Sequence, residues 1–133
     1  MILKKEVSTL SRSELLYLNR FLKKTCQEII GHTNPDIRTF NKDNNNFLGL
    51  YDPEYHRICI YRNNLKTINV YVKVFIHEWT HSLQKKLEKY YLAMEFKWGY
   101  RNNPFEVEAR ENEKIYKSIV WKIVKLRLRE VNL

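Results

Sequence analysis

The sequence has few of the residues that build covalent frameworks. It contains only two cysteines among 133 residues, and neither Cys26 nor Cys59 belongs to a CxxC or CxxH pair. Two cysteines are too few for a disulfide scaffold of the kind that stabilises small secreted domains. We therefore predict that both are reduced thiols in the hydrophobic core, as suits an intracellular protein.

Long hydrophobic runs are also missing. No stretch approaches the roughly 20 apolar residues that cross a membrane, and the first sixteen residues lack the apolar segment of a signal peptide. These features predict a cytoplasmic protein without a membrane partner. Alanine is rare, whereas asparagine, lysine, tyrosine and isoleucine are abundant. This bias is typical of an AT-rich genome, which favours a bacterial, viral or phage origin.

Negative charge is in the minority, because 15 acidic residues face 24 lysines and arginines and give a net charge of +9. Such an excess attracts nucleic acid and other polyanions, so nucleic acid is a candidate partner. Apolar residues are plentiful, since 44% of the chain is hydrophobic and 14% is aromatic. This content distinguishes the chain from disordered proteins and predicts a single folded domain over residues 1–133.

The periodicity of the first half predicts one helix and two strands. Behind a Ser-Arg-Ser-Glu capping box, apolar residues recur at helical spacing over residues 11–30, and Gly31 offers a stop, which defines an N-terminal helical segment, residues 1–31. Residues 31–46, with Pro35 and many asparagines, are expected to form a loop. The runs NFLGLYD and HRICIYR, separated by a turn at Pro53, predict two strands of a small sheet.

Two further helices are expected in the second half. Residues 69–91 place their apolar side chains on one arc, with His77 and His81 on the opposite side. The stretch MEFKWGYRNN is then expected to be a loop, before Asn103 and Pro104 open a helix over residues 104–130. In that helix the residues predicted to face the core are Ile115, Ile119, Val120, Ile123, Val124 and Leu126. The predicted class is α+β, with the sheet packed on the middle helix.

The stretch VFIHEWTH, residues 74–81, contains the candidate metal-binding residues. Residues four apart lie on one face of a helix about one turn from each other, so His77 and His81 can bind one metal ion. Glu78 points beside that position, where it can take a proton from metal-activated water. The competing interpretation is that both histidines are solvated residues on the helix surface.

A catalytic zinc site needs a third protein ligand. Glu88 would lie about two turns beyond His81, roughly 10 Å along the helix, which is too far. His32 and His56 are alternatives without a supporting pattern. The stretch NPFEVEAR offers Glu106 and Glu108, which lie about 200° apart around a helix, so only one of the two can face the metal.

The sequence HEWTH with a downstream ExEA resembles the gluzincin branch of the zincin metallopeptidases, especially its small, minimal-domain members. The resemblance covers roughly residues 47–113 and implies a zincin-like core that binds one Zn²⁺ ion. Matching the family's ExxA motif to Ala109 makes Glu106 the third ligand. Arg110 stands where many relatives have a residue that orients a histidine, so a backbone carbonyl or Glu113 must supply that contact.

The resemblance also implies an activity, the zinc-dependent hydrolysis of peptide bonds in a protein or peptide substrate. Glu78 would be the general acid and base, and Tyr100 would stabilise the oxyanion, with Tyr91 and Tyr116 as rivals. The strand at residues 57–61 would border the substrate cleft. The alternatives are a basic nucleic-acid-binding or virion-associated protein, and a zincin-like regulator without peptidase activity.

Overall fold

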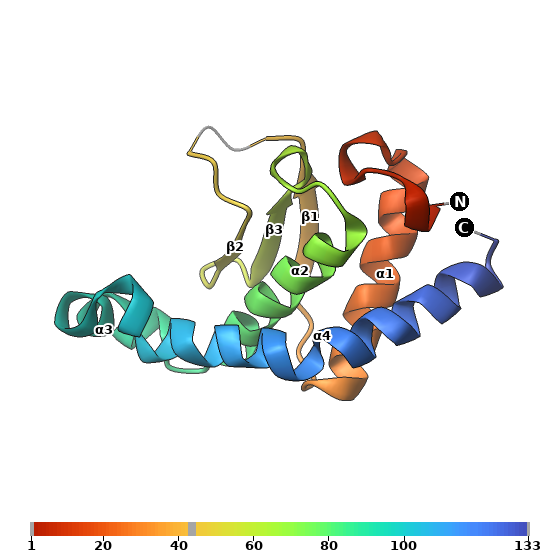
Figure 1. Ribbon diagram of the computed structural model, residues 1–133. Helices are drawn as coiled ribbons and strands as arrows, with labels where there is room; N and C mark the ends of the chain where they lie inside the picture. Colours follow the sequence, from red (N-terminus) through yellow and green to blue (C-terminus); the bar gives the residue numbers. More distant parts are fainter. Residues whose placement is uncertain (1, 43–44, 133) are drawn as a thin grey trace.

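A three-stranded sheet and four α-helices make up the computed structural model, which describes residues 2–42 and 45–132 (Figure 1). The strands are β1 (Asp36–Phe40), β2 (Gly49–Asp52) and β3 (Arg57–Tyr61), in the order β1-β3-β2. Strand β3 is central, parallel to β1 and antiparallel to β2. The predicted α+β class is confirmed, and β2 forms one edge of the sheet.

Helix α1 (Arg12–Ile29) begins as predicted. The Ser11 side chain accepts a hydrogen bond from the backbone N–H of Glu14, and the Glu14 carboxylate accepts one from the backbone N–H of Ser11. This reciprocal pair is the capping box. Two short 3-10 helices, Ile2–Lys4 and Val7–Thr9, precede the helix and bury Ile2 and Val7.

Helix α2 (Ile68–Leu83) lies between the sheet and the last helix and is buried on several sides. Thr67 caps its start by accepting a hydrogen bond from the N–H of Val70. Phe75 and Trp79 are fully buried in the core. Polar residues of the same helix are buried as well, and such groups require hydrogen-bonding partners.

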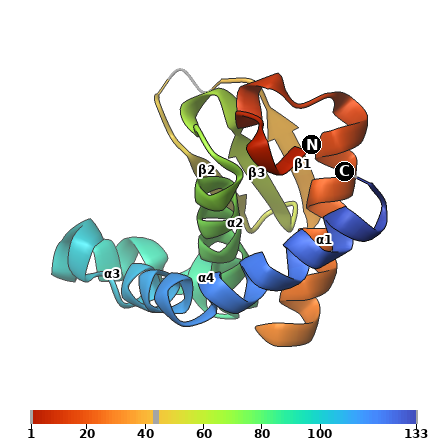
Figure 2. The ribbon, with the colours of Figure 1, turned by 45° about the vertical axis from the view of Figure 1, so that its right-hand side comes forward.

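Helix α4 (Pro104–Glu130) runs across both α2 and α1 (Figures 1 and 2). Asn103 caps it as predicted, by accepting a hydrogen bond from the N–H of Phe105. Ala109 is fully buried. The Asn112 side chain donates to the hydroxyl group of Thr80, which joins α4 to α2.

The predicted core face of α4 is partly wrong. Val120 and Val124 are buried, but Ile115, Ile119 and Leu126 are among the exposed residues. At about 100° per residue the two groups lie on nearly opposite sides of the helix. Only one side can pack against α1 and α2, and the apolar pattern alone does not say which.

Two other predictions are also wrong. Strand β1 lies within the expected loop of residues 31–46, of which residues 43–44 fall outside the described part of the chain. The helix expected over residues 69–91 ends at Leu83, and α3 (Leu87–Asn102) then occupies the expected loop. Neither glycine nor proline marks this break, and the one kink in α3 lies at Gly99, where φ is 75°.

The cysteines and the helices also bear on the predictions of reduced thiols and of a chain without a membrane span. Both cysteines are buried and unpaired, as predicted. None of the helices within residues 2–42 and 45–132 combines the length and the apolar character required to cross a membrane. Helix α3 extends from one side of the molecule beside the start of α4 (Figure 1), and Leu87 is its one buried residue.

Candidate metal centre

Three side chains from one face of α2 gather at the candidate site. His77, Glu78 and His81 each offer a ligand atom, and these atoms lie within 4.8 Å of one another. Glu78 is 7% exposed, His81 is 6% exposed and the side chain of His77 is 14% exposed. These residues are therefore not solvated surface side chains, and the surface interpretation of the two histidines is wrong.

The first turn of α4 brings Glu106 to the same point. Its Oε1 atom lies 2.8 Å from Nε2 of His77 and 3.1 Å from Nε2 of His81. The structure thus places together the three side chains that the sequence predicts as ligands. The close packing of α4 on α2 delivers the carboxylate, and Glu106 is itself only 4% exposed.

The orientation of His77 is set by Glu113, two turns further along α4. The Glu113 Oε1 atom lies 2.8 Å from Nδ1 of His77. A carboxylate only accepts, so Nδ1 carries the proton and the Nε2 atom faces Glu106. Of the two predicted ways to orient a histidine without help from Arg110, the structure has the Glu113 contact.

Gln84 orients His81. Its amide nitrogen donates to the carbonyl of Phe105 and to Oε1 of Glu108, so its oxygen must face His81, at 2.7 Å from Nδ1. The Nδ1 atom therefore carries the proton here as well. Glu108, the rival ligand, holds Gln84 instead of entering the site. No pattern in the sequence points to Gln84, because its role depends on the chain turning at this residue.

A divalent cation fits this donor set. Each imidazole donates its Nδ1 proton outward and aims Nε2 at the same carboxylate oxygen. Without a cation, both Nε2 atoms must also be protonated to face Glu106, which makes two buried imidazolium ions side by side. With a cation, both Nε2 lone pairs and the carboxylate bind it, while Glu113 and Gln84 orient the imidazoles from outside.

The shifted pKa values of the histidines and glutamates at the site also reflect their burial and close contacts. Burial alone would lower the pKa of His77, but hydrogen bonds to Glu106 and Glu113 raise it to about 10. The pKa of His81 is raised by Glu106 against the effect of burial, and the pKa of Glu106 is lowered by both histidines against its own burial. Burial raises the pKa of Glu78, which favours a group that exchanges protons.

We expect zinc binding at pH 7 to release at least one proton, because the pKa of His77 is raised to about 10 and that of His81 is raised as well. Protonation of His77 therefore stabilises the metal-free cluster at low pH, and this contribution is lost as the pH rises through about 10. Zinc affinity should accordingly rise with pH. Calorimetry in buffers of different ionisation enthalpy measures the release, and an enthalpy independent of the buffer would contradict it.

Three tyrosines were rivals for the oxyanion. The Tyr91 hydroxyl group donates to Oε2 of Glu106 at 2.5 Å, which leaves Oε1 to face the histidines. Tyr116 packs against the hydrophobic core. Tyr100 lines the cavity at the site, and burial followed by the charges of Glu106 and Glu78 raises its pKa. Within the described residues, the hydroxyl groups of the other two cavity-lining tyrosines, Tyr51 and Tyr91, form hydrogen bonds, whereas that of Tyr100 does not.

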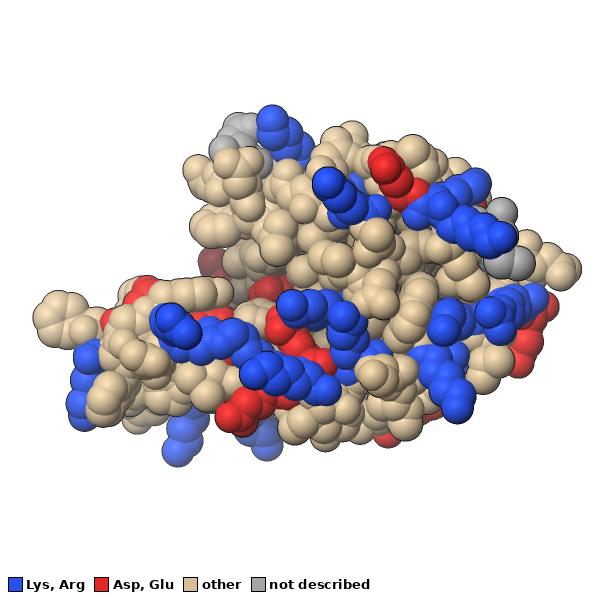
Figure 3. Space-filling view, viewed as in Figure 1, with Lys and Arg blue, Asp and Glu red and all other residues tan. Residues whose placement is uncertain are grey.

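A cavity of about 350 Å³ opens onto the three α2 residues. Its walls come from β2, α2, α3 and α4, and atoms of acidic side chains are visible in the hollow between β2 and α4 (Figure 3).

The prediction that residues 57–61 border the cleft is wrong, because β3 is the central strand and its neighbour β2 lies at the cavity. At Gly49 a Cβ atom would meet Val74 Cγ1 at 2.7 Å, so glycine lets β2 approach α2.

Among the described residues, the alternative third ligands are not part of the group formed by His77, Glu78 and His81. His56 binds Thr33 and Tyr51 through its two ring nitrogens, and His32 is exposed in the segment before β1. Glu88 was excluded as a ligand because it was expected on the same helix as His81. The structure places it in α3, where it lines the cavity, so this reason for excluding it is wrong.

The Arg110 guanidinium donates to the carbonyl of Arg101.

Comparison with known proteins adds no family. No protein-family model matches the chain, and no curated protein or solved structure is significantly similar to it. The interpretation of the site therefore rests on its own geometry.

Removing the Glu113 contact tests how the site is oriented. We expect Glu113→Ala to weaken zinc binding by about tenfold to a hundredfold, because His77 would lose the acceptor that fixes its ring. Glu111→Ala, an exposed neighbour on α4, is the matched control and should bind zinc like the original protein. Competition with a chromophoric chelator measures both affinities. Equal affinities for the two variants would contradict the assignment.

Proposed function

We propose that the protein is a zinc-dependent peptidase of the zincin type. The observation that carries this proposal is the convergence of His77 Nε2, His81 Nε2 and Glu106 Oε1, with the buried carboxylate of Glu78 beside them. Two imidazoles and one carboxylate form a common ligand set of catalytic zinc and leave a position open for water. The site opens onto a cavity large enough for part of a peptide.

The arrangement of secondary structure supports the zincin-like assignment. An edge strand lies antiparallel to its neighbour and beside the helix that carries HEWTH, and a later helix supplies the glutamate. This order resembles the minimal zincin domain that the motifs imply. In this proposal residues 47–113 form the metal-site core.

In the proposed mechanism the zinc ion, when bound, supplies Lewis-acid chemistry that polarises a peptide carbonyl and acidifies water. Glu78 takes the proton of the attacking water and passes it to the leaving amine. Tyr100 donates a hydrogen bond to the oxygen of the carbonyl under attack. The free edge of β2 binds the substrate backbone in extended form, while Glu113, Gln84 and Tyr91 hold the ligand side chains in place.

The direct test is metal-dependent hydrolysis. The purified protein is incubated with a mixed library of unstructured peptides, and the products are identified by mass spectrometry. We expect cleavage by the zinc-loaded protein, loss of cleavage after chelation, and recovery when one equivalent of zinc is restored. Cleavage that is insensitive to chelation, or no cleavage by zinc-loaded protein, would contradict the proposal.

A further inference from the structure

The cleft continues beyond the metal centre along β2. A second cavity lies next to the first, and the two share wall residues around the site: Phe47, Gly49, His77, Glu78 and Tyr100. The second cavity reaches the residues before β2, from Asn46 onward, whereas the first reaches Pro53, just after β2. The cleft therefore extends to both sides of the candidate reaction centre.

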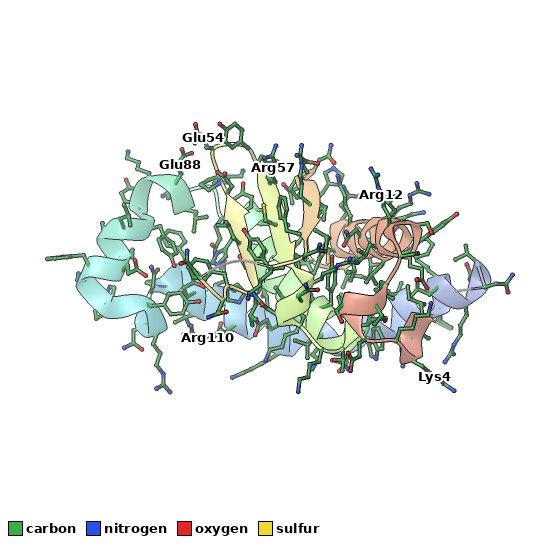
Figure 4. The ribbon with its side chains drawn as sticks, turned by 90° about the horizontal axis from the view of Figure 1, so that it is seen from above. Lys4, Arg12, Glu54, Arg57, Glu88 and Arg110 are labelled. Atoms are coloured by element: carbon green, nitrogen blue, oxygen red, sulfur yellow. The ribbon has the colours of Figure 1, made fainter. Side chains whose placement is uncertain are left out.

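The two ends of the cleft carry opposite charge. At the end before β2 the walls include Lys73 and Arg110, one from α2 and one from α4. Lys73 precedes His77 by four residues and Arg110 follows Glu106 by four, so each lies one helical turn from a candidate ligand. At the end after β2 the walls include Glu88 of α3. Figure 4 shows Glu88 and Arg110 towards opposite ends of the sheet strands.

These charges are not neutralised by ion pairs within the described residues, and the Arg110 guanidinium, which donates one hydrogen bond to the carbonyl of Arg101, has further N–H donors. In the described part of the chain, Lys73, Arg110 and Glu88 form no ion pairs with other side chains. Glu113 also lines the Lys73 end, but its Oε1 atom is held by His77. The pKa of Tyr51, another residue of the cavity wall, is raised by burial, then by the charge of Asp52 and then by that of Glu88. The charge of Glu88 therefore acts inside the cavity. An acidic end is unexpected in a chain of net charge +9.

We propose that this cleft selects an extended peptide by polarity, with a basic side chain at Glu88 and a carboxylate at Lys73 and Arg110. The proposal rests on the peptidase function proposed above and names its substrate class. A peptide that pairs antiparallel with β2 runs from the Pro53 end towards the Phe47 end. The basic residue therefore precedes the scissile bond, and the carboxylate follows it.

The carboxylate can come from two sources that share the same chemistry. One is an aspartate or glutamate side chain of the substrate, and the other is the free C-terminus of a short peptide. Either would meet two cations at the Lys73 end. The test includes a separate peptide for each source.

Binding is measured with the zinc-loaded Glu78→Gln protein, so that the result does not depend on turnover. Three fluorescent peptides share an alanine-phenylalanine centre. The first has arginine near its N-terminus and glutamate near its amidated C-terminus, and the second has the same residues in reverse order. The third has arginine near its N-terminus, glutamine in place of glutamate, and a free C-terminal carboxylate.

We expect the first or the third peptide, or both, to bind at least about fivefold more tightly than the second, because two partly exposed ion pairs distinguish them. High salt should reduce this ratio. A preference for the third alone identifies the carboxylate as the chain terminus. Equal binding of all three, tighter binding of the reversed peptide, or no binding would overturn the proposal.

Variants assign the preference to the named residues. The triple variant Lys73→Gln, Arg110→Gln and Glu88→Gln, in the same Glu78→Gln protein, should abolish it. The matched control is Lys114→Gln, Lys122→Gln and Glu130→Gln, three exposed α4 residues that do not line the cleft, and it should keep the preference. A preference that survives the first set of substitutions would overturn the assignment. Whether the native protein hydrolyses the preferred peptide tests the peptidase function separately.

Discussion

Replacing Glu78 by glutamine should lower peptide hydrolysis by at least about a thousandfold while zinc stays bound. The amide cannot accept a proton from the attacking water, and general acid and base catalysis contributes about a hundredfold to ten-thousandfold. Glu78 offers an atom within 4.8 Å of those of the two histidines, but the contacts of 2.8 and 3.1 Å join Glu106 to His77 and His81, so zinc affinity should change little. Initial rates and zinc content are measured on the same preparation.

The control for this experiment is Glu111→Gln, an exposed carboxylate on α4 that does not line the cleft. It removes one negative charge without touching the site and should leave the rate unchanged. Hydrolysis by the Glu78→Gln protein at more than a tenth of the original rate would show that another group carries the proton. Loss of zinc from this variant would instead show that Glu78 is a ligand.

Replacing Glu106 by glutamine should weaken zinc binding by about a hundredfold or more. This change removes the one anionic ligand and leaves two neutral imidazoles. It also replaces one of the two carboxylate oxygens, which face the histidines and Tyr91, by an amide nitrogen that cannot accept a hydrogen bond or bind zinc well. Isothermal titration with zinc at pH 7 measures the affinity, and circular dichroism checks that the variant is folded.

Glu108→Gln is the matched control, because the two glutamates lie two residues apart on the same helix. Glu108 accepts a hydrogen bond from Gln84 and reaches the site only through that residue. Its replacement should weaken zinc binding by no more than about tenfold. If Glu108→Gln lost zinc and Glu106→Gln kept it, the third ligand would be wrongly assigned.

The sequence predicted the central part of the site because its pattern is local. His77, Glu78 and His81 lie within five residues of one helix, and helical periodicity alone places the two histidines together. The cap at Asn103 and Pro104 fixes where α4 begins, so it also fixes which side of that helix Glu106 occupies. Glu106 and Glu108 could not be separated by geometry alone, because this depends on how α4 rotates against α2.

The features that the sequence missed depend on tertiary contacts. The break after Leu83 has no glycine or proline, and Leu87 continues the apolar spacing of the helix before it. What accompanies the turn is the Gln84 side chain, which binds His81 of α2 and both Phe105 and Glu108 of α4. Strand β1 was missed for a similar reason, since residues 36–40 are half exposed and become a strand by pairing with β3.

X-ray absorption at the zinc edge tests the central claim most directly. Protein dialysed against zinc and then against buffer should retain one zinc ion per chain, with two imidazole nitrogens and one carboxylate oxygen at about 2.0–2.2 Å. The Glu106→Gln protein should lose the ion or show a changed shell of oxygen neighbours. A protein that retains no zinc, or a spectrum without two imidazoles, would contradict the account.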